Sequence, residues 1–177
     1  MADTALLIID IQNDYFPGGA MELEGADAAG AKAGAALKQF RSKGLPVFHV
    51  RHLSVRPGST FFLPGTKGAE IHASVTPQKG EKVIEKNFPN SFRATSLQDE
   101  LKGVKNLVVA GMMTHMCVDA SVRHAADLGY KITLLGDACA TRAQKIAGET
   151  VPARQVHLAF LAALNGFYAK VIDSHEL

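Results

Sequence analysis

The sequence lacks the features that mark several classes of protein. No apolar run is long enough to span a bilayer, since the longest lies around Leu6 to Ile9, and the amino terminus has no basic region followed by a long apolar stretch. Neither sign of charge dominates, because 19 basic and 17 acidic residues are spread along the chain and leave a net charge of +2. Such an even distribution argues against nucleic acid as a partner. We therefore expect a cytoplasmic protein that binds neither nucleic acid nor membranes.

Cysteine is scarce as well, since the chain holds only Cys117 and Cys139. In a chain of this length without a secretion signal the thiols usually stay reduced, so we do not expect a disulfide between them. Cys139, within the segment GDACAT, fits a small buried hydrophobe. Cys117 needs a separate explanation.

Length and composition predict one compact domain that covers residues 1–177. Hydrophobic residues make up 47% of the chain and charged residues 20%, which is near the average for globular proteins and excludes disorder, collagen and coiled coil. Apolar runs alternate with helical patterns, which predicts an α/β fold: a doubly wound, Rossmann-like, mainly parallel six-stranded sheet with helices on both faces. Strands are expected at Thr4 to Asp10, Pro46 to Arg51, Lys82 to Lys86, Leu107 to Gly111, Lys131 to Leu135 and Ala169 to Ile172. Helices are expected at Ala26 to Lys43, Ser96 to Leu101, Cys117 to Leu128 and Pro152 to Leu164.

One long segment shows no sustained periodicity. Leu53 to Gly80 carries Pro57, Pro64, Pro77 and several glycines. Loops of this length inside a compact domain usually serve a function. We therefore expect a lid or a substrate-binding loop here.

Three chemically different side chains are expected at the carboxyl edge of the sheet, where ligands bind in open α/β folds. Asp10 ends the first predicted strand, Lys86 ends the third, and Cys117 follows the fourth at the start of a helix. The helix dipole and a nearby ammonium group should lower the pKa of the thiol. A neighbouring carboxylate can take the thiol proton and later protonate a leaving amine. Taken singly, each residue also has a structural reading, as a buried thiol, a loop cap or a strand-end charge.

Several motifs carry a resemblance to a known family. The segments LLIIDIQNDY, GTKGAEIH, VIEKNFPNSF, VVAGMMTHMCV and GDACAT, in this order and spacing, resemble the isochorismatase-like cysteine hydrolase superfamily, which includes nicotinamidases, N-carbamoylsarcosine amidohydrolases and ureidoacrylate amidohydrolases. The resemblance runs from Leu6 to about Tyr168, and GMMTHMC is its most specific part.

The resemblance implies site residues that agree with the choice made from the residues alone. It implies a catalytic triad of Cys117, Asp10 and Lys86. It also implies a cis peptide bond between Met112 and Met113, and an oxyanion hole formed by the amides of Met113 and Cys117.

Metal-dependent nicotinamidases resemble the chain but carry Asp-x-His just after the second strand and further histidines in the following loop. The corresponding residues here are His52, Leu53 and Ser54, followed by Thr60 and Phe61. The carboxylate ligand is missing, so we expect neither a metal nor another cofactor. A zinc site among the remaining histidines is disfavoured because one strand places His49 and His52 on opposite faces and no cysteine or carboxylate is suitably spaced. Whether a residual site survives near His52 and His72 stays open.

The expected function is hydrolysis of a C–N bond in a small amide or ureide through a thioester acyl-enzyme. Isochorismatases proper resemble the chain but lack the cysteine, so ether hydrolysis is the weaker alternative. A non-catalytic α/β module that binds a small molecule or a partner, with Cys117 as a redox-sensing or structural thiol, is another. A dinucleotide oxidoreductase is disfavoured because QNDYFPGG, and not Gly-x-Gly-x-x-Gly, follows the first strand. The side chains expected at the substrate, because they flank the catalytic motifs, are Tyr15, Phe61, Asn87, His115 and Met116.

Two properties are left open by the sequence. The resemblance implies a homodimer or a larger homo-oligomer but fixes no number of subunits. The substrate itself, and whether a neighbouring subunit completes the pocket, cannot be read from one chain.

Overall fold

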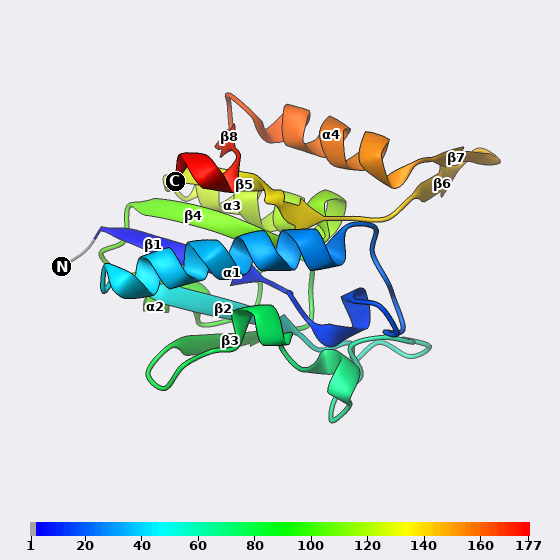
Figure 1. Cartoon of the computed structure of the whole chain (residues 1–177), viewed down its shortest axis with the longest axis horizontal. Coiled ribbons are helices and arrows are strands. Elements are labelled where there is room, and N and C mark those ends of the chain that lie inside the picture. The colour runs from blue at the N-terminus through cyan, green and yellow to red at the C-terminus, as the bar shows by residue number, and fades with distance from the viewer. Residues whose placement is uncertain (1–2) are drawn as a thin grey trace.

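The computed structural model describes residues 3–177 and is built around a six-stranded parallel sheet with the order β3-β2-β1-β4-β5-β8 (Figure 1). Its strands are β1 (Thr4–Ile9), β2 (Val47–His52), β3 (Lys82–Lys86), β4 (Asn106–Met112), β5 (Lys131–Ala140) and β8 (Lys170–Ile172). The doubly wound α/β fold expected from the sequence is confirmed, and most strand ends lie within one or two residues of the prediction.

The strand order reverses beside β1. This strand pairs with β2 on one side and with β4 on the other, and its apolar sequence TALLII is buried along almost its whole length. Chain connections leave β1 and β4 toward opposite sides of the sheet, which opens a crevice at the carboxyl ends of these two strands. Asp10, directly after β1, lies at this point with a left-handed backbone φ of 51°.

Helices cover both faces of the sheet, as predicted. They are α1 (Ala26–Ser42), α2 (Leu97–Glu100), α3 (Asp119–Asp127) and α4 (Ala153–Leu164). Figure 1 shows α1 lying along one face, where its alanines, Leu37 and Phe40 join a core cluster with alternate residues of β1. The other face packs against α2, α3 and α4. None of the helices within residues 3–177 is both long and apolar enough to cross a membrane.

The close approach of α1 to the rest of the chain depends on a small residue. A Cβ atom built on Gly34 would lie 2.6 Å from the carbonyl oxygen of Ser74, a backbone atom that cannot rotate away. Glycine weakens a helix interior by about 1 kcal/mol, but at this position it allows α1 to pack directly against the long loop.

Two parts of the fold differ from the sequence prediction. The fifth strand continues past Leu135 to Ala140, and a short antiparallel hairpin follows it, formed by β6 (Gln144–Ile146) and β7 (Glu149–Val151). This hairpin projects from the body at the end where the loops gather (Figure 1). The helix expected from Cys117 begins instead as a π-helical turn, Thr114–Val118, that continues into α3.

The long segment between β2 and β3 is tied to the chain that follows β1. The Gln12 amide donates hydrogen bonds to the carbonyl oxygens of His52 and Ala69, at 2.9 and 2.8 Å. The Asp14 carboxylate accepts one from the amide of Phe62 at 2.6 Å. Because these contacts are buried or partly buried, the loop is held against the carboxyl edge of the sheet.

Candidate active site

Three charged or ionisable side chains meet at the carboxyl edge of the sheet. Asp10 follows β1, Lys86 ends β3, and Cys117 lies in the π-helical turn after β4. The Asp10 carboxylate lies 2.7 Å from Lys86 Nζ, and Lys86 donates a hydrogen bond to Cys117 Sγ at 3.3 Å. All three side chains are nearly or fully buried. The structure thus brings together the residues that the sequence predicts as a triad.

The ammonium group of Lys86 has a third neighbour that the sequence did not assign to it. His52 Nδ1 lies 2.9 Å from Lys86 Nζ. An ammonium group has three donors and no acceptor, so Nδ1 must be the accepting nitrogen of a neutral imidazole. Burial, together with the charge of Lys86, lowers the pKa of His52 to about 4, which keeps the ring neutral.

The charge of Lys86 is maintained despite its burial. Burial acts to lower the pKa of its ammonium group, but the nearby Asp10 and Cys117 outweigh that effect, and the pKa is raised on balance. A cation therefore contacts both the carboxylate and the thiol.

The predicted lowering of the pKa of Cys117 is wrong in direction. Burial raises the pKa of this thiol, the charge of Asp10 raises it further, and the opposing effect of Lys86 is smaller. The thiol also lies inside a π-helical turn and not at the first residue of a regular helix, so the dipole argument carries less weight. The resting cysteine is a thiol, and it needs a base in order to react.

One oxygen of the Asp10 carboxylate has no hydrogen-bond donor among the described residues. Asp10 Oδ1 is buried and accepts no hydrogen bond from residues 3–177. Unpartnered buried carboxylate oxygens are rare and are typical of reactive sites. Asp10 can therefore accept a proton from a neighbouring thiol or from water.

The backbone before Cys117 has the cis peptide bond that the resemblance implies. The Met112–Met113 peptide bond is cis. The carbonyl oxygen of Met113 then accepts hydrogen bonds from the amides of Met116 and Val118, at 3.0 and 3.3 Å, which closes the turn around the thiol. The oxyanion-binding role of the Met113 and Cys117 amides stays a prediction.

A cavity of about 330 Å³ opens above Cys117. Its lining residues lie at the ends of β1, β2, β3, β4 and β5 or in the segments that follow these strands. The cavity is therefore at the carboxyl edge of the sheet. Of the five side chains expected at the substrate, four line this cavity, namely Tyr15, Phe61, Asn87 and Met116. The fifth, His115, does not: its Nδ1 lies at hydrogen-bond distance from the Thr141 hydroxyl, and its ring contacts Phe160 edge-on.

Other lining residues were missed at the sequence level. Ser54, Val55, Arg56 and Ser59 belong to the long loop, which was expected to contact a ligand but not residue by residue. Arg142 directly follows the GDACAT motif, and Met21 and Phe62 are brought in by the packing of the loop against the chain after β1. The position of Arg142 next to this motif was the one feature of the sequence that could have indicated its place in the cavity.

The donor atoms of Asp10, His52 and Cys117 all lie within 4.8 Å of one another, a spacing that could hold a metal ion. The expectation that no cysteine or carboxylate is suitably spaced to His52 is therefore wrong, because the fold joins residues from three separate segments. However, Lys86 Nζ already contacts all three of these side chains. A divalent cation would have to bind beside a buried ammonium, so the residues do not fit a metal.

The other two histidines considered for a metal are engaged elsewhere. His49 is buried and lies 3.0 Å from a Glu81 carboxylate oxygen through its Nε2. The His72 ring stacks on Phe16 with the ring centres 3.5 Å apart. Neither belongs to the cavity above Cys117.

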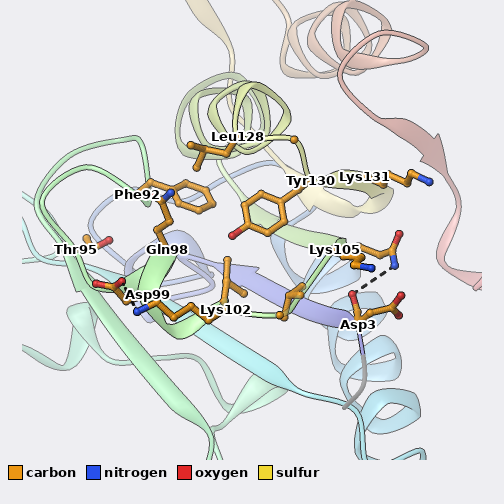
Figure 2. A pocket seen from close by; sticks show the side chains of 15 residues that line it. Asp3, Phe92, Thr95, Gln98, Asp99, Lys102, Lys105, Leu128, Tyr130 and Lys131 are labelled. Atoms are coloured by element: carbon orange, nitrogen blue, oxygen red, sulfur yellow. Dashed lines mark hydrogen bonds and ion pairs between the residues drawn. The ribbon is translucent and has the colours of Figure 1, made fainter.

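A larger hollow, of about 660 Å³, lies at the opposite edge of the sheet. Figure 2 shows the rings of Phe92 and Tyr130 side by side in its wall, with the side chains of Asp99 and Lys102 also lining it. Its lining contains neither cysteine nor histidine, and Asp99 and Lys102 already pair with each other at 3.2 Å. Size alone therefore does not identify the reactive site.

Known proteins of one family match nearly the whole chain. The family model described as the isochorismatase domain matches residues 4–176. An uncharacterized isochorismatase family protein of Bacillus subtilis is 53% identical over 95% of this chain and 94% of its own length. The crystal structure of an isochorismatase from Pseudomonas putida is 36% identical, with a TM-score of 0.92, over 99% of this chain and 90% of that chain.

Some of the more distant relatives have names that state a reaction. A streptothricin hydrolase of Streptomyces noursei is 34% identical over 84% of this chain and 55% of its own length. A nicotinamidase of Arabidopsis thaliana and a ureidoacrylate amidohydrolase of Rhizobium rhizogenes are each 28% identical, over 98% and 77% of this chain and 86% and 70% of their own lengths.

Proposed function

Since this chain belongs to the isochorismatase family of hydrolases, we propose that it is a cysteine hydrolase that cleaves a C–N bond of a small amide or ureide. Cys117 is the nucleophile, Asp10 is the proton acceptor and donor, and Lys86 holds the two in place. The observation that carries the proposal is the meeting of a thiol, a carboxylate with a free oxygen and an ammonium group in one buried cluster beside a cavity.

The first half of the reaction forms a thioester. Asp10 takes the thiol proton as Cys117 Sγ attacks the carbonyl carbon, and the amides of Met113 and Cys117 receive the developing oxyanion. When the tetrahedral intermediate collapses, the C–N bond breaks, and Asp10 returns the proton to the nitrogen. Ammonia or an amine leaves.

The second half restores the enzyme. Asp10 takes a proton from water, the resulting hydroxide attacks the thioester, and the sulfur leaves as a thiolate that recovers the proton from Asp10. One amide and one water become one acid and one amine, with no net oxidation or reduction.

Burial explains why this chemistry needs all three residues. The raised pKa of Cys117 makes a standing thiolate costly, so the proton must move to Asp10 as the sulfur attacks. The adjacent ammonium of Lys86 stabilises the negative charge wherever it lies, on the carboxylate or on the sulfur. A catalytic thiol also separates this proposal from ether hydrolysis and from a binding module with an inert cysteine.

The test is a panel of small amides and ureides assayed for release of ammonia. Cys117→Ala should abolish turnover while leaving the circular dichroism spectrum and the melting temperature near those of the parent protein. Intact-protein mass spectrometry of the parent should detect the acyl-enzyme during turnover. Unimpaired hydrolysis by Cys117→Ala would exclude the mechanism, and Cys139→Ala serves as the matched control.

A further inference from the structure

The residues that line the cavity above Cys117 include two arginines and no acidic residue. Most of its lining is apolar or aromatic, and none of its 15 lining residues is aspartate or glutamate. Two of them, Arg56 and Arg142, are arginines. They come from different segments, the long loop and the chain that follows β5, so the fold brings two positive charges to one small cavity.

Four of the chain's five other arginines have visible partners, and the fifth, Arg154, lies outside this cavity. Three form ion pairs and one lies over an aromatic ring: Arg41 with Glu81, Arg51 with Glu85, Arg123 with Asp119, and Arg93 with Phe88. Within residues 3–177, neither Arg56 nor Arg142 forms an ion pair with a carboxylate. The two guanidinium groups at the cavity are therefore available to a ligand.

Each of the two charges acts on a residue that lines the cavity. Burial is the main cause of the lowered pKa of His52, and Arg56 adds to it. Burial likewise raises the pKa of Tyr15, and Arg142 opposes that rise. His52 and Tyr15 both line the cavity, so each arginine acts on one of its lining residues, whereas the buried Asp10 acts on both of them in the opposite sense.

The lining residues of the cavity differ in their exposure to solvent. Cys117, Met113 and Phe62 are almost completely buried, whereas Arg56 and Arg142 are exposed. A bound molecule would place its reacting carbonyl at the dry end near the thiol, and its far end between the two guanidinium groups.

On the premise of the proposed function, we propose that the substrate is an anionic amide or ureide whose carboxylate, remote from the scissile C–N bond, binds Arg142 and Arg56. A guanidinium group matches a carboxylate with two parallel hydrogen bonds, which gives orientation as well as charge. An apolar spacer between the two groups fits the aromatic walls formed by Tyr15, Phe61 and Phe62. A cationic amide meets two like charges, and a neutral amide leaves them unpaired.

The test uses two matched series of primary amides that differ only in the group remote from the amide. The short series is succinamate, its methyl ester and beta-alaninamide. The aromatic series is para-carbamoylbenzoate, its methyl ester and para-(aminomethyl)benzamide. We expect kcat/KM for the carboxylate to exceed that for the ester by about tenfold or more at low salt in at least one series, the preference shrinking as salt screens the charges.

Substitutions of the two arginines test whether they cause the preference for the carboxylate. Arg142→Gln should raise KM for the carboxylate substrate with kcat nearly unchanged, and the double variant with Arg56→Gln should remove the preference over the ester. Arg154→Gln is the matched control, since Arg154 is exposed on α4 and lines a different hollow. A preference for the ester or the cation, or a preference that survives in the double variant, would overturn the inference while leaving the proposed function intact.

A binding measurement separates the two proposals. Calorimetry with Cys117→Ala measures the affinity for succinamate and para-carbamoylbenzoate without turnover. Binding that Arg142→Gln weakens supports the anion site even where hydrolysis fails. If neither carboxylate binds Cys117→Ala more tightly than its own ester, the anion site is excluded whatever the assay of ammonia shows.

Discussion

His52 Nδ1 lies 2.9 Å from Lys86 Nζ, which makes the imidazole the third acceptor of a buried ammonium group whose other two neighbours are Asp10 and Cys117. This contact fixes where the ammonium lies between base and nucleophile. It also fixes the proton of neutral His52 on Nε2, in a ring that lines the cavity.

Removing this acceptor should slow the reaction. We expect His52→Leu to lower kcat about ten- to a hundredfold, because a hydrogen bond to a charged group contributes about 1.5 to 3 kcal/mol. His52→Asn should restore much of the loss, since its side-chain oxygen can take the place of Nδ1. The pH profile gives a second readout: neutral His52 is lost as the pH falls through about 4, and the asparagine variant should lack that contribution. Parent-like kcat and pH dependence in the leucine variant would contradict the role.

Lys86→Met should affect both stability and reactivity. Removing one partner of a buried ion pair leaves Asp10 unpaired and costs about 3 to 5 kcal/mol of unfolding free energy. Urea unfolding measures this cost, and Asp10→Asn combined with Lys86→Met should recover much of it without recovering turnover. Alkylation of Cys117 should move to still higher pH in Lys86→Met, because the cation that opposes the raised pKa is gone. An unchanged alkylation profile would remove Lys86 from the site.

Exhaustive chelation should leave activity in place. The three donors that could bind a metal already surround Lys86 Nζ, so the enzyme has a built-in cation at that point. Conversely, Lys86→Ala should gain affinity for zinc through Asp10, His52 and Cys117, detected by calorimetry. Activity that is lost on chelation and restored by zinc or iron would contradict the assignment.

Cys139→Ala should leave turnover unchanged. Cys139 is buried in β5, outside the lining of the cavity above Cys117, and burial raises its pKa to about 12. The expected loss of stability is about 1 kcal/mol, the scale of one buried sulfur or methylene group. A collapse of kcat similar to that of Cys117→Ala would mean that the wrong thiol had been assigned.

Glu81→Gln should weaken the fold in a pH-dependent way. Hydrogen bonding from Arg41 is the main cause that lowers the pKa of Glu81 to about 2, and His49 also contributes. The folded pKa lies below the unfolded one, so this stability is fully present above about pH 4.5 and is lost as the pH falls toward 2. Urea unfolding at neutral pH should show a loss of about 1 to 3 kcal/mol in the variant. The difference from the parent should shrink in acid.

The sheet could be predicted from the sequence because its strands are apolar runs of the length that a buried parallel strand requires. The short hairpin could not. Its strands have three residues each, and its turn, at Ala147 and Gly148 with φ of 51° and 80°, lacks the Asn-Gly or Asp-Gly pair that signals such a turn. The end of β5 was missed because Gly136 and Asp137 interrupt its apolar pattern.

The clustering of Asp10, Lys86 and Cys117 could be predicted because the carboxyl ends of parallel strands lie at the same edge of a sheet, whatever the side chains are. The electrostatics of the thiol could not, since they depend on how deeply the fold buries Cys117. The third acceptor, His52, was also out of reach, because its contact with Lys86 depends on the register of β2 against β3, in which these two residues are direct partners. The cytoplasmic location and the number of subunits remain predictions.

The left-handed backbone conformation of Asp10 restricts which amino acids this position can accept. Glycine, asparagine and aspartate enter that region most readily, and other side chains pay about 1 to 2 kcal/mol there. Glycine and asparagine fit the turn but cannot carry a proton between thiol and nitrogen. Glutamate could carry it but needs room for a further methylene in a site with no exposed surface. Aspartate is therefore the one amino acid that both adopts this backbone readily and can carry the proton. When position 10 is replaced by all other amino acids, we expect only the aspartate parent to be fully active.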